Sequence, residues 1–431
     1  MNKNRQKVLE HTKTKYMVFF KYLVFSFLWP FGGLWYALGH VKNKYSKHLF
    51  WFFCIYFGFV FIIPKVTANS ADSSRIAAAF VELHKQPVSW HSLLEAFYNP
   101  AIMLTDIYQT LVSWIVSLFT GNPNILYAVF AAVFGFFYAH NLWIVLDRIK
   151  LRHNLIVIVF FTVFAFINPI WNINGVRMWT AGQIFIYGIL LIFIEKKKKG
   201  LIWILITPLV HFSFLFGFLI VLIYKLVPSK IMLRATTLLF ILYLIATFYS
   251  QISLLQVRNY LSFLPQVFLT KVNYYTNLYY AADINATVYH WQIIVAKYII
   301  RYVTLLWVII LFLKRKKWMK NDHILNGLFN FGLFFGVFAQ IVSNIPSGGR
   351  FLSFSNIIFY VIFILFLAKK NYGLKIKIAA SLSIPFLLFY LIIVFRQGAD
   401  FFGFFTLFGN PILALVIKNQ LSLAHVVKAI F

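Results

Sequence analysis

Long apolar runs alternate with short basic clusters along the chain. A run of about 20 apolar residues is long enough for an α-helix to cross the hydrocarbon core of a bilayer. Such runs lie at 17–39, 48–64, 123–146, 154–171, 178–194, 201–224, 231–250, 291–313, 324–345, 351–368 and 377–395. A weaker apolar stretch at 100–119 predicts an interfacial or buried helix. The pattern predicts an all-α, polytopic integral membrane protein of about 10–12 transmembrane helices, in a single transmembrane domain over residues 1–431.

Composition and charge agree with a bilayer as the environment. Of the 431 residues, 61% are hydrophobic, and the formal net charge is +30. A charge of this size invites a nucleic-acid interpretation, but the Lys and Arg side chains fall in short clusters between apolar runs, the pattern that orients a membrane protein. We therefore expect no nucleic-acid partner. The single cysteine, Cys54, lies inside an apolar run, which excludes a disulfide framework.

The basic clusters predict which loops share the cytoplasmic side. They lie at 42–47, 148–152, 196–199, 225–234, 314–317 and 369–377. Positive-inside bias places all six on one side, so the run at 201–224 is predicted to enter and return as a re-entrant-like hairpin. Pro208 and His211 mark its break, with His211 near mid-membrane. The run at 17–39 has similar flanks and is either a second hairpin, broken at 30–33, or one span.

If the basic clusters are cytoplasmic, the remaining polar segments face outward. They are the long mixed segment 65–122, the stretch that opens around Arg177, the tyrosine-rich loop 251–290, the turn 347–350, and the turn after Arg396.

The acidic residues argue against metal-dependent chemistry. The chain has ten of them, spread singly, with no pair at the short spacing that a divalent cation requires. The sequence also lacks the G-x-x-x-x-G-K loop of nucleotide hydrolysis and the G-x-S-x-G elbow of serine hydrolases. We expect no catalytic metal, no nucleotide-sugar donor and no cofactor.

Outward-facing arginines are candidates for binding phosphate, because guanidinium stays charged and binds phosphate bidentately. Arg177 opens a helix, whose N-terminus itself attracts anions, and Arg350 follows Ser-Gly-Gly, whose amides are accessible to an anion. Arg177 and Arg350 are therefore candidate catalytic residues. For Arg75 and Arg396 we favour a pairing with a nearby acid or a contact with lipid headgroups.

Two further polar residues are candidates for catalysis. His211 stands at the predicted break of the 201–224 hairpin, although a lone histidine is also a common buried residue. Asp72 in "NSADSSRI" is either a site residue or a cap of the helix that follows.

The loop 251–290 combines charged and aromatic side chains in a way that suits sugars. Tyrosine faces pack on the C–H faces of sugar rings, while charged groups bond the hydroxyls; the alternative interpretation is an interfacial aromatic belt. The candidate substrate-binding residues are Arg258, Lys271, Tyr274, Tyr275, Asp283 and His290.

Several of these motifs resemble one family. "NGVRMWTAGQIFIYGILLIFIEKKKKG" with "TPLVHFSF" is similar to the EpsG-like branch of the Wzy-type polysaccharide polymerases, in which an arginine opens a helix and a histidine follows in the next hairpin. "NSADSSRI" resembles the family's outer-loop aspartate, and "SGGRFLSF" its second arginine. At the position where the family commonly has a tyrosine after that aspartate, this chain has Arg75-Ile76.

The resemblance implies a metal-independent glycosyltransferase of the multi-spanning, lipid-dependent type in a bacterial inner membrane. Such enzymes join undecaprenyl-diphosphate-linked oligosaccharide repeat units into a surface polysaccharide, such as that of lipopolysaccharide, at the periplasmic face. A chain-length regulator is a candidate protein partner. Segments 65–122 and 251–290 would then be the two large periplasmic segments.

In the mechanism that this implies, Arg177 and Arg350 stabilise the leaving diphosphate. The base that accepts the proton of the acceptor hydroxyl is His211, Asp72, Asp283 or His290. Three alternatives remain open: an O-antigen ligase, a flippase for lipid-linked oligosaccharides, and a membrane acyltransferase.

Overall fold

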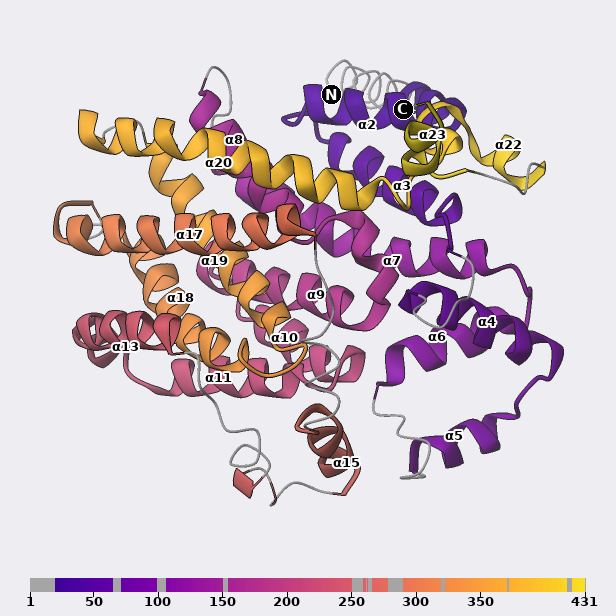
Figure 1. Cartoon of the computed structure of the whole chain (residues 1–431), viewed down its shortest axis with the longest axis horizontal. Helices are drawn as coiled ribbons and strands as arrows, with labels where there is room; N and C mark the ends of the chain where they lie inside the picture. The colour runs from indigo at the N-terminus through magenta and orange to yellow at the C-terminus, as the bar shows by residue number, and fades with distance from the viewer. Residues whose placement is uncertain are drawn as a thin grey trace, which may run out of the picture.

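The computed structural model confirms the all-α polytopic architecture (Figure 1). It describes residues 20–64, 71–98, 106–149, 154–249, 259–260, 262, 266–277, 290–318, 322–369, 372–416 and 421–430. Within these ranges there is no β-strand, only an isolated bridge between Gly403 and Ser422.

The described helices follow the apolar runs closely. They are α2 (Pro30–Gly39), α3 (Ser46–Phe59), α4 (Asp72–Lys85), α5 (Trp90–Tyr98), α6 (Ile107–Ser117), α7 (Pro123–Leu146), α8 (Leu155–Ile167), the 3₁₀-helix η1 (Ile170–Gly175), α9 (Val176–Phe193), α10 (Gly200–Val210), α11 (Phe214–Leu226), α12 (Ser229–Arg234), α13 (Thr236–Phe248), α15 (Gln266–Tyr275), α17 (Trp291–Trp318), α18 (His323–Val342), α19 (Gly349–Leu367), α20 (Leu374–Gly398), α21 (Phe404–Phe408), α22 (Pro411–Val416) and α23 (Leu423–Ile430).

Six stretches in the described ranges are long and apolar enough to cross a membrane. They are Pro123–Leu146, Leu155–Phe193, Trp291–Lys317, His323–Val342, Gly349–Leu367 and Leu374–Gly398. The second stretch includes α8, η1 and α9. Shorter apolar helices, among them α6, α10, α11 and α13, pack beside the long ones.

The run at 201–224 is a helical hairpin. Helix α10 rises along α9, with Ile204 packed against Gly188, and His211 then adopts an extended backbone that ends the helix. Helix α11 returns along α9: Ser213 lies beside Met178, Gly217 beside Phe185, and the rings of Tyr224 and Phe193 are 5.8 Å apart. Pro208 lies inside α10, so the reversal itself occurs at 211–213.

The segment 20–39 is a second helical hairpin, which decides between the two alternatives left by the sequence. Residues 20–28 are helical and α2 follows after a break at Trp29. The rings of Tyr22 and Tyr36 stack at 4.0 Å, and a Cβ placed on Gly33 would lie 2.6 Å from the Ser26 Cβ. Trp29 Nε1 donates a hydrogen bond to the Leu407 carbonyl at 2.8 Å, which anchors the turn to the C-terminal part of the chain.

Basic residues from distant loops gather at one end of the helices. Arg148 donates to Glu195 Oε1 at 3.1 Å, and Lys225 lies over the Phe193 ring at 5.0 Å. Lys42 donates to the Leu146 carbonyl at 2.7 Å, and Lys369 pairs with Asp322. The described parts of the basic clusters therefore share the end of the bundle at which α9 finishes.

Glycines permit close helix packing in the interior. A Cβ on Gly58 of α3 would lie 2.4 Å from the Tyr127 carbonyl oxygen of α7. A Cβ on Gly188 of α9 would lie 2.8 Å from the Gly200 carbonyl oxygen of α10. Small residues of this kind allow membrane helices to approach by van der Waals contact.

Candidate active site

Three reversals of the chain meet at the end of the bundle opposite the basic clusters. They are the η1-to-α9 junction, the α10–α11 turn and the α18–α19 turn. Phe214 of α11 lies 5.4 Å from the rings of both Phe351 and Phe354 of α19, and Trp179 of α9 lies 5.7 Å from Phe354. These aromatic contacts bring Arg177, His211 and Arg350, which the sequence singled out separately, to one region.

A buried carboxylate joins two of the reversals. Asp106 Oδ2 accepts a hydrogen bond from Arg177 Nη1 at 2.9 Å, and Asp106 Oδ1 accepts one from the Phe212 backbone N–H at 2.8 Å. The Asp106 side chain is 2% exposed, whereas that of Arg177 is 45% exposed. Burying a carboxylate is costly unless it is paired and hydrogen-bonded, and both conditions are met here.

His211 and Ser213 form a hydroxyl–imidazole pair within the α10–α11 turn. Ser213 Oγ lies 2.8 Å from His211 Nδ1, and the Ser213 backbone N–H donates to the same nitrogen at 3.3 Å. Because Nδ1 accepts from an amide, this geometry assigns the proton of a neutral imidazole to Nε2. Ser213 Oγ also lies 3.7 Å from Met178 Sδ, which ties the turn to α9.

The α18–α19 turn presents Arg350 through an unusual backbone. Ser347 has a φ of 65°, in the left-handed region that few residues other than glycine occupy. Gly348 comes so close to α18 that a Cβ there would lie 2.0 Å from the Val342 carbonyl oxygen, so only glycine fits. The Arg350 side chain makes no hydrogen bond or ion pair with another residue in the described part of the chain.

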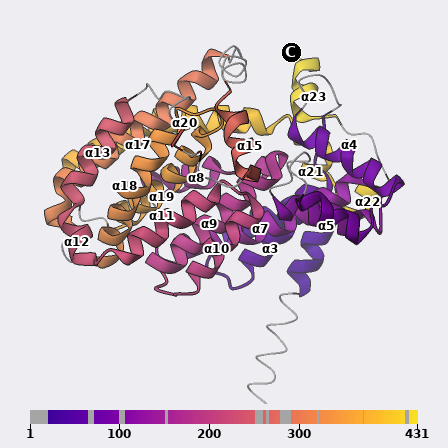
Figure 2. The ribbon, with the colours of Figure 1, turned by 90° about the horizontal axis from the view of Figure 1, so that it is seen from below.

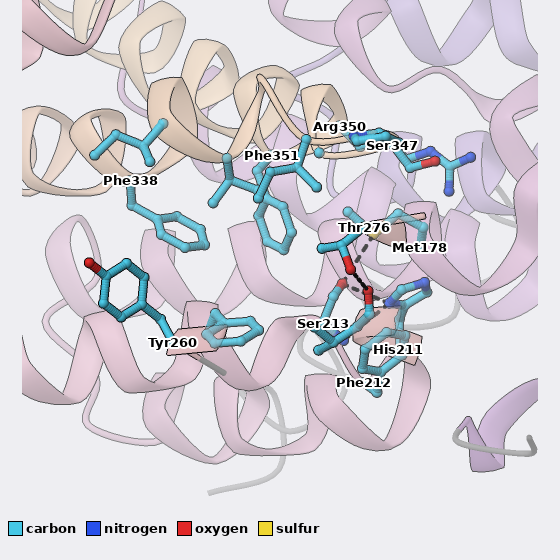
Figure 3. A pocket seen from close by; sticks show the side chains of 17 residues that line it. Met178, His211, Phe212, Ser213, Tyr260, Thr276, Phe338, Ser347, Arg350 and Phe351 are labelled. Carbon is cyan, nitrogen blue, oxygen red and sulfur yellow. Dashed lines mark hydrogen bonds between the residues drawn. The ribbon is translucent and has the colours of Figure 1, made fainter. Parts of the chain in front are cut away.

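A pocket of about 350 Å³ lies between these turns (Figure 3). Figure 3 shows Ser347 and Arg350 on one side and His211 and Ser213 on the other, with Met178 and Thr276 between them. The rest of the lining is mostly apolar: Phe212, Phe216, Val272, Phe338, Ile341, Val342, Ile345, Pro346 and Phe351, with Tyr260 and Gly348. The pocket therefore combines mostly apolar walls with a guanidinium, that of Arg350, for which the described part of the chain offers no partner.

Asp72 lies near Arg177 but has a different partner. It pairs with Arg75, and its Oδ2 lies 3.8 Å from the position of a Cβ on Gly175, two residues before Arg177. The Ser73 backbone N–H donates to Asn174 Oδ1 at 3.2 Å, which holds α4 against η1. The acid that contacts Arg177 is Asp106, to which the sequence analysis assigned no role.

The substrate-binding candidates of loop 251–290 do not all lie at the same site. Arg258 and Asp283 lie outside the described residues. Lys271, Tyr274 and Tyr275 belong to α15, whose Val272 and Thr276 line the pocket. His290 lines a separate cavity, together with Arg396 and Asp400. Arg396 pairs with Asp400 at 3.4 Å and Arg75 pairs with Asp72, so both arginines have the acidic partners expected of them.

Arg301 is a further arginine with a defined partner, and no motif in the sequence pointed to it. Arg301 lies inside the long apolar helix α17, and its Nη2 donates to the Thr247 carbonyl near the end of α13. A cation at a helix C-terminus is stabilised by the free carbonyls there. The apolar run at 291–313 contains two cations, Lys297 and Arg301, and an ionisable residue inside a span is expected to have a partner, which was the signal available in the sequence.

The described residues contain no group of three or more His, Cys, Asp or Glu side chains that could hold a metal ion. Comparisons of the chain with protein-family models, with curated proteins and with solved structures gave no match.

Proposed function

We propose that this chain is a glycosyltransferase that joins undecaprenyl-diphosphate-linked oligosaccharide units into a surface polysaccharide, at the periplasmic face of a bacterial inner membrane. The observation that carries the proposal is the pocket of about 350 Å³, with its apolar walls and an Arg350 side chain that has no hydrogen-bond or ion-pair partner among the described residues. A lipid diphosphate has the same two parts, a hydrocarbon tail and an anionic head. The sequence motifs that resemble the Wzy-type polymerases support the same assignment.

Arg177 is the second group proposed to bind the diphosphate. Asp106 accepts one hydrogen bond from the Arg177 guanidinium, donated by Nη1. Guanidinium carries five N–H donors in a fixed plane, so the remaining donors of the 45% exposed side chain can bind phosphate oxygens. Asp106 would orient the fork of Arg177 without blocking it.

The proposed reaction is a displacement at the anomeric carbon of the donor. A hydroxyl oxygen of the acceptor sugar forms a bond to that carbon while the bond from the carbon to the diphosphate oxygen breaks, and the electron pair leaves with the diphosphate. Arg350 and Arg177 stabilise the charge that develops on the leaving group. No metal ion is required, because two guanidinium groups take its electrostatic role.

The proton of the acceptor hydroxyl is proposed to pass to the Ser213–His211 pair. Ser213 Oγ takes this proton as its own proton moves to His211 Nδ1, 2.8 Å away, which forms an imidazolium. Of the other three candidate bases, Asp72 is paired with Arg75 and His290 lines another cavity. Asp283 lies outside the described residues.

The test is polymerisation by the purified protein in liposomes that contain lipid-linked repeat units. We expect the units to be joined into a ladder of products, and Arg350→Gln to reduce the rate by at least tenfold. The matched control is Arg234→Gln, because Arg234 is an exposed arginine in the last turn of α12, outside the pocket.

A gene deletion separates polymerisation from the alternative functions. A polymerase deletion leaves surface lipid that carries single repeat units and no ladder. Loss of the single unit as well would favour a ligase or a flippase and contradict the proposal. Transport of lipid-linked units across liposomes without bond formation would favour the flippase alone.

A further inference from the structure

An arginine joins α13 to α17 at the periphery of the bundle. Figure 2 shows these two helices next to each other at the edge of the molecule. Toward the basic end of the bundle, the rings of Phe240 and Phe312 stack at 3.7 Å. Toward the opposite end, Arg301 Nη2 donates to the Thr247 carbonyl. Of the apolar window of α17 33% is buried, against 78% of that of α19, so much of α17 faces the surroundings of the bundle.

Arg301 meets α13 at the level where two helices end. Thr247 lies in the last turn of α13, and Tyr249 follows directly after this helix. The Asn344 side chain, two residues after the end of α18, donates to the Tyr249 carbonyl at 3.1 Å. Helices α13 and α18 therefore end at one level, opposite the basic clusters. Because arginine side chains extend toward the bilayer interface, a guanidinium at this level is within reach of lipid headgroups.

No acidic residue stands on the helices around Arg301. The sequences of α13, α17 and α18 contain neither aspartate nor glutamate. Among the described residues, the Arg301 guanidinium makes one hydrogen bond, to the Thr247 carbonyl, and its Nε is buried without a partner. The carbonyls at a helix C-terminus carry about half an elementary charge, so they offset the guanidinium only in part. The remaining Nη donors of this half-buried side chain can bind an anion.

A second cation and exposed apolar side chains lie beside Arg301. Lys297, four residues earlier, is exposed and shares one face of α17 with Arg301. Ile294 continues this face and is 40% exposed, while Ile245 and Phe248 of α13 are 58% and 68% exposed. Cations among exposed hydrocarbon side chains suit an amphiphile with an anionic head and apolar chains. A soluble anion would leave the apolar side chains uncovered.

We propose that the seam between α13 and α17, formed by Ile245, Phe248, Ile294, Lys297 and Arg301, binds an anionic phospholipid of the surrounding bilayer. The lipid phosphate lies against the two cations, and the acyl chains lie along the apolar side chains. The phosphate supplies the full negative charge that the Thr247 carbonyl lacks. We expect phosphatidylglycerol to bind better than phosphatidylethanolamine, whose ammonium group is repelled by both cations. This inference does not rest on the proposed function.

The test places a photo-crosslinking amino acid at Phe248, in liposomes of equal amounts of phosphatidylglycerol and phosphatidylethanolamine. The control position is Ile392 of α20, which is 64% exposed and lies away from the seam. Mass spectrometry of the adducts gives the ratio of the two lipids at each position. We expect phosphatidylglycerol to be enriched roughly tenfold at position 248 relative to position 392, which corresponds to one charge-assisted hydrogen bond. Equal ratios at the two positions would overturn the inference.

Two variants identify the cations that select the lipid. Arg301→Gln should reduce the ratio at position 248 to that at position 392, and Lys297→Gln should reduce it in part. The second variant is needed because Arg301 also bonds the Thr247 carbonyl, so that its loss can unfold the end of α13. The matched control is Arg148→Gln, since Arg148 already pairs with Glu195 at 3.1 Å, and it should leave the ratio unchanged. Enrichment that persists in both seam variants would contradict the assignment.

Competition distinguishes the phospholipid from other sources of phosphate. Excess glycerol 1-phosphate, which carries the anion without acyl chains, should leave the phosphatidylglycerol adduct at position 248 unchanged. Loss of the adduct would mean that the seam binds a soluble anion. Displacement by a small amount of lipid-linked repeat units would instead assign the seam to the substrate of the proposed function, and would also overturn the inference. Failure of the protein to polymerise repeat units would leave the inference intact, because the crosslinking involves no reaction of those units.

Discussion

Asp106 and Arg177, 71 residues apart in the chain, form an ion pair in which the carboxylate is buried and the guanidinium is half exposed. The same carboxylate accepts the Phe212 amide, directly after His211. One acidic side chain therefore sets the positions of the first turn of α9 and of the α10–α11 turn together. This coupling fixes two of the three reversals at the candidate active site relative to each other.

Asp106→Asn tests this coupling. Asparagine keeps an oxygen for the Phe212 amide but loses the charge that holds Arg177. A charge-assisted hydrogen bond contributes roughly 1.5–3 kcal/mol, so we expect polymerisation to slow by about 10- to 150-fold if the bond holds Arg177 in its transition-state position. The rate is measured on purified protein in liposomes, after thermal unfolding has shown that the variant is folded.

The matched control is Asp72→Asn. Asp72 also forms an ion pair with an arginine, but its side chain is 41% exposed and its partner is Arg75. Exposed pairs of this kind contribute little, so we expect a change of less than about threefold in rate. A larger effect at Asp72 than at Asp106 would show that the wrong carboxylate has been assigned to Arg177.

In a deletion strain, the Arg177→Lys variant is expected not to restore polymerisation. Lysine keeps the positive charge, but it lacks the planar fork that can bind Asp106 and a phosphate at the same time. We expect less than roughly one tenth of the normal rate, measured as the length distribution of polysaccharide in a complemented deletion strain. Chains of near-normal length would reduce Arg177 to a general electrostatic role.

Polymerisation is expected to continue in excess EDTA. The described part of the chain has no cluster of metal-binding side chains, while Arg177 and Arg350 offer positive charge for a diphosphate. The measurement compares initial rates in liposomes with EDTA, without it, and with added magnesium. A reaction that stops in EDTA and resumes with magnesium would contradict the arginine-based mechanism.

Local signals in the sequence account for most helix positions. The run predicted at 123–146 is α7, Pro123–Leu146, because a proline suits the first turn and the Asn122 side chain accepts the Asn124 amide. The hairpin at 201–224 also followed from local features, since its flanks are basic and His211 interrupts the helix. These features depend on neighbouring residues alone.

Contacts between distant segments were beyond the sequence analysis. In the sequence, Asp106 is a single acid inside the weak apolar stretch at 100–119, and only the packing of α6 beside α9 shows its partner. The form of the segment 20–39 depends on Trp29 and Leu407, which are 378 residues apart. The spacing of residues along the chain does not predict which distant residues will be in contact, so these two pairings become visible only in the folded structure.

Acidification is expected to destabilise the basic end of the bundle. Burial would raise the pKa of Glu195, but hydrogen bonds from Arg148 and Lys197, together with their charges, outweigh burial and lower it. Because the folded pKa is lower than the unfolded value of about 4.3, the stabilisation is present above that pH and is lost as the pH falls through the folded pKa. Thermal unfolding in detergent at pH 7 and below pH 4 measures the loss.

Glu195→Gln provides the comparison for this acid effect. Glutamine cannot take part in the titration, so the variant should be less stable at pH 7 and should lose less stability on acidification. Some loss should remain at Asp322. Burial would raise the pKa of Asp322, but the hydrogen bonds from Lys369 and from the Leu325 amide outweigh burial and lower it. A variant with the same pH dependence as the natural chain would show that Glu195 does not contribute.

The last prediction concerns the sidedness of the α10–α11 hairpin. Since Ile204 packs on Gly188 and Tyr224 lies beside Phe193, both open ends of the hairpin lie near the end of α9. Single cysteines at Lys198 and Pro228, in a Cys54→Ala background, should both resist an impermeant maleimide in intact cells and react after permeabilisation. A cysteine at Ser347, in the turn beside the pocket, should react in intact cells and serves as the positive control. Labelling of position 228 without position 198 would mean that the segment crosses the membrane once. The outward placement proposed for α15 and for the pocket would then be wrong.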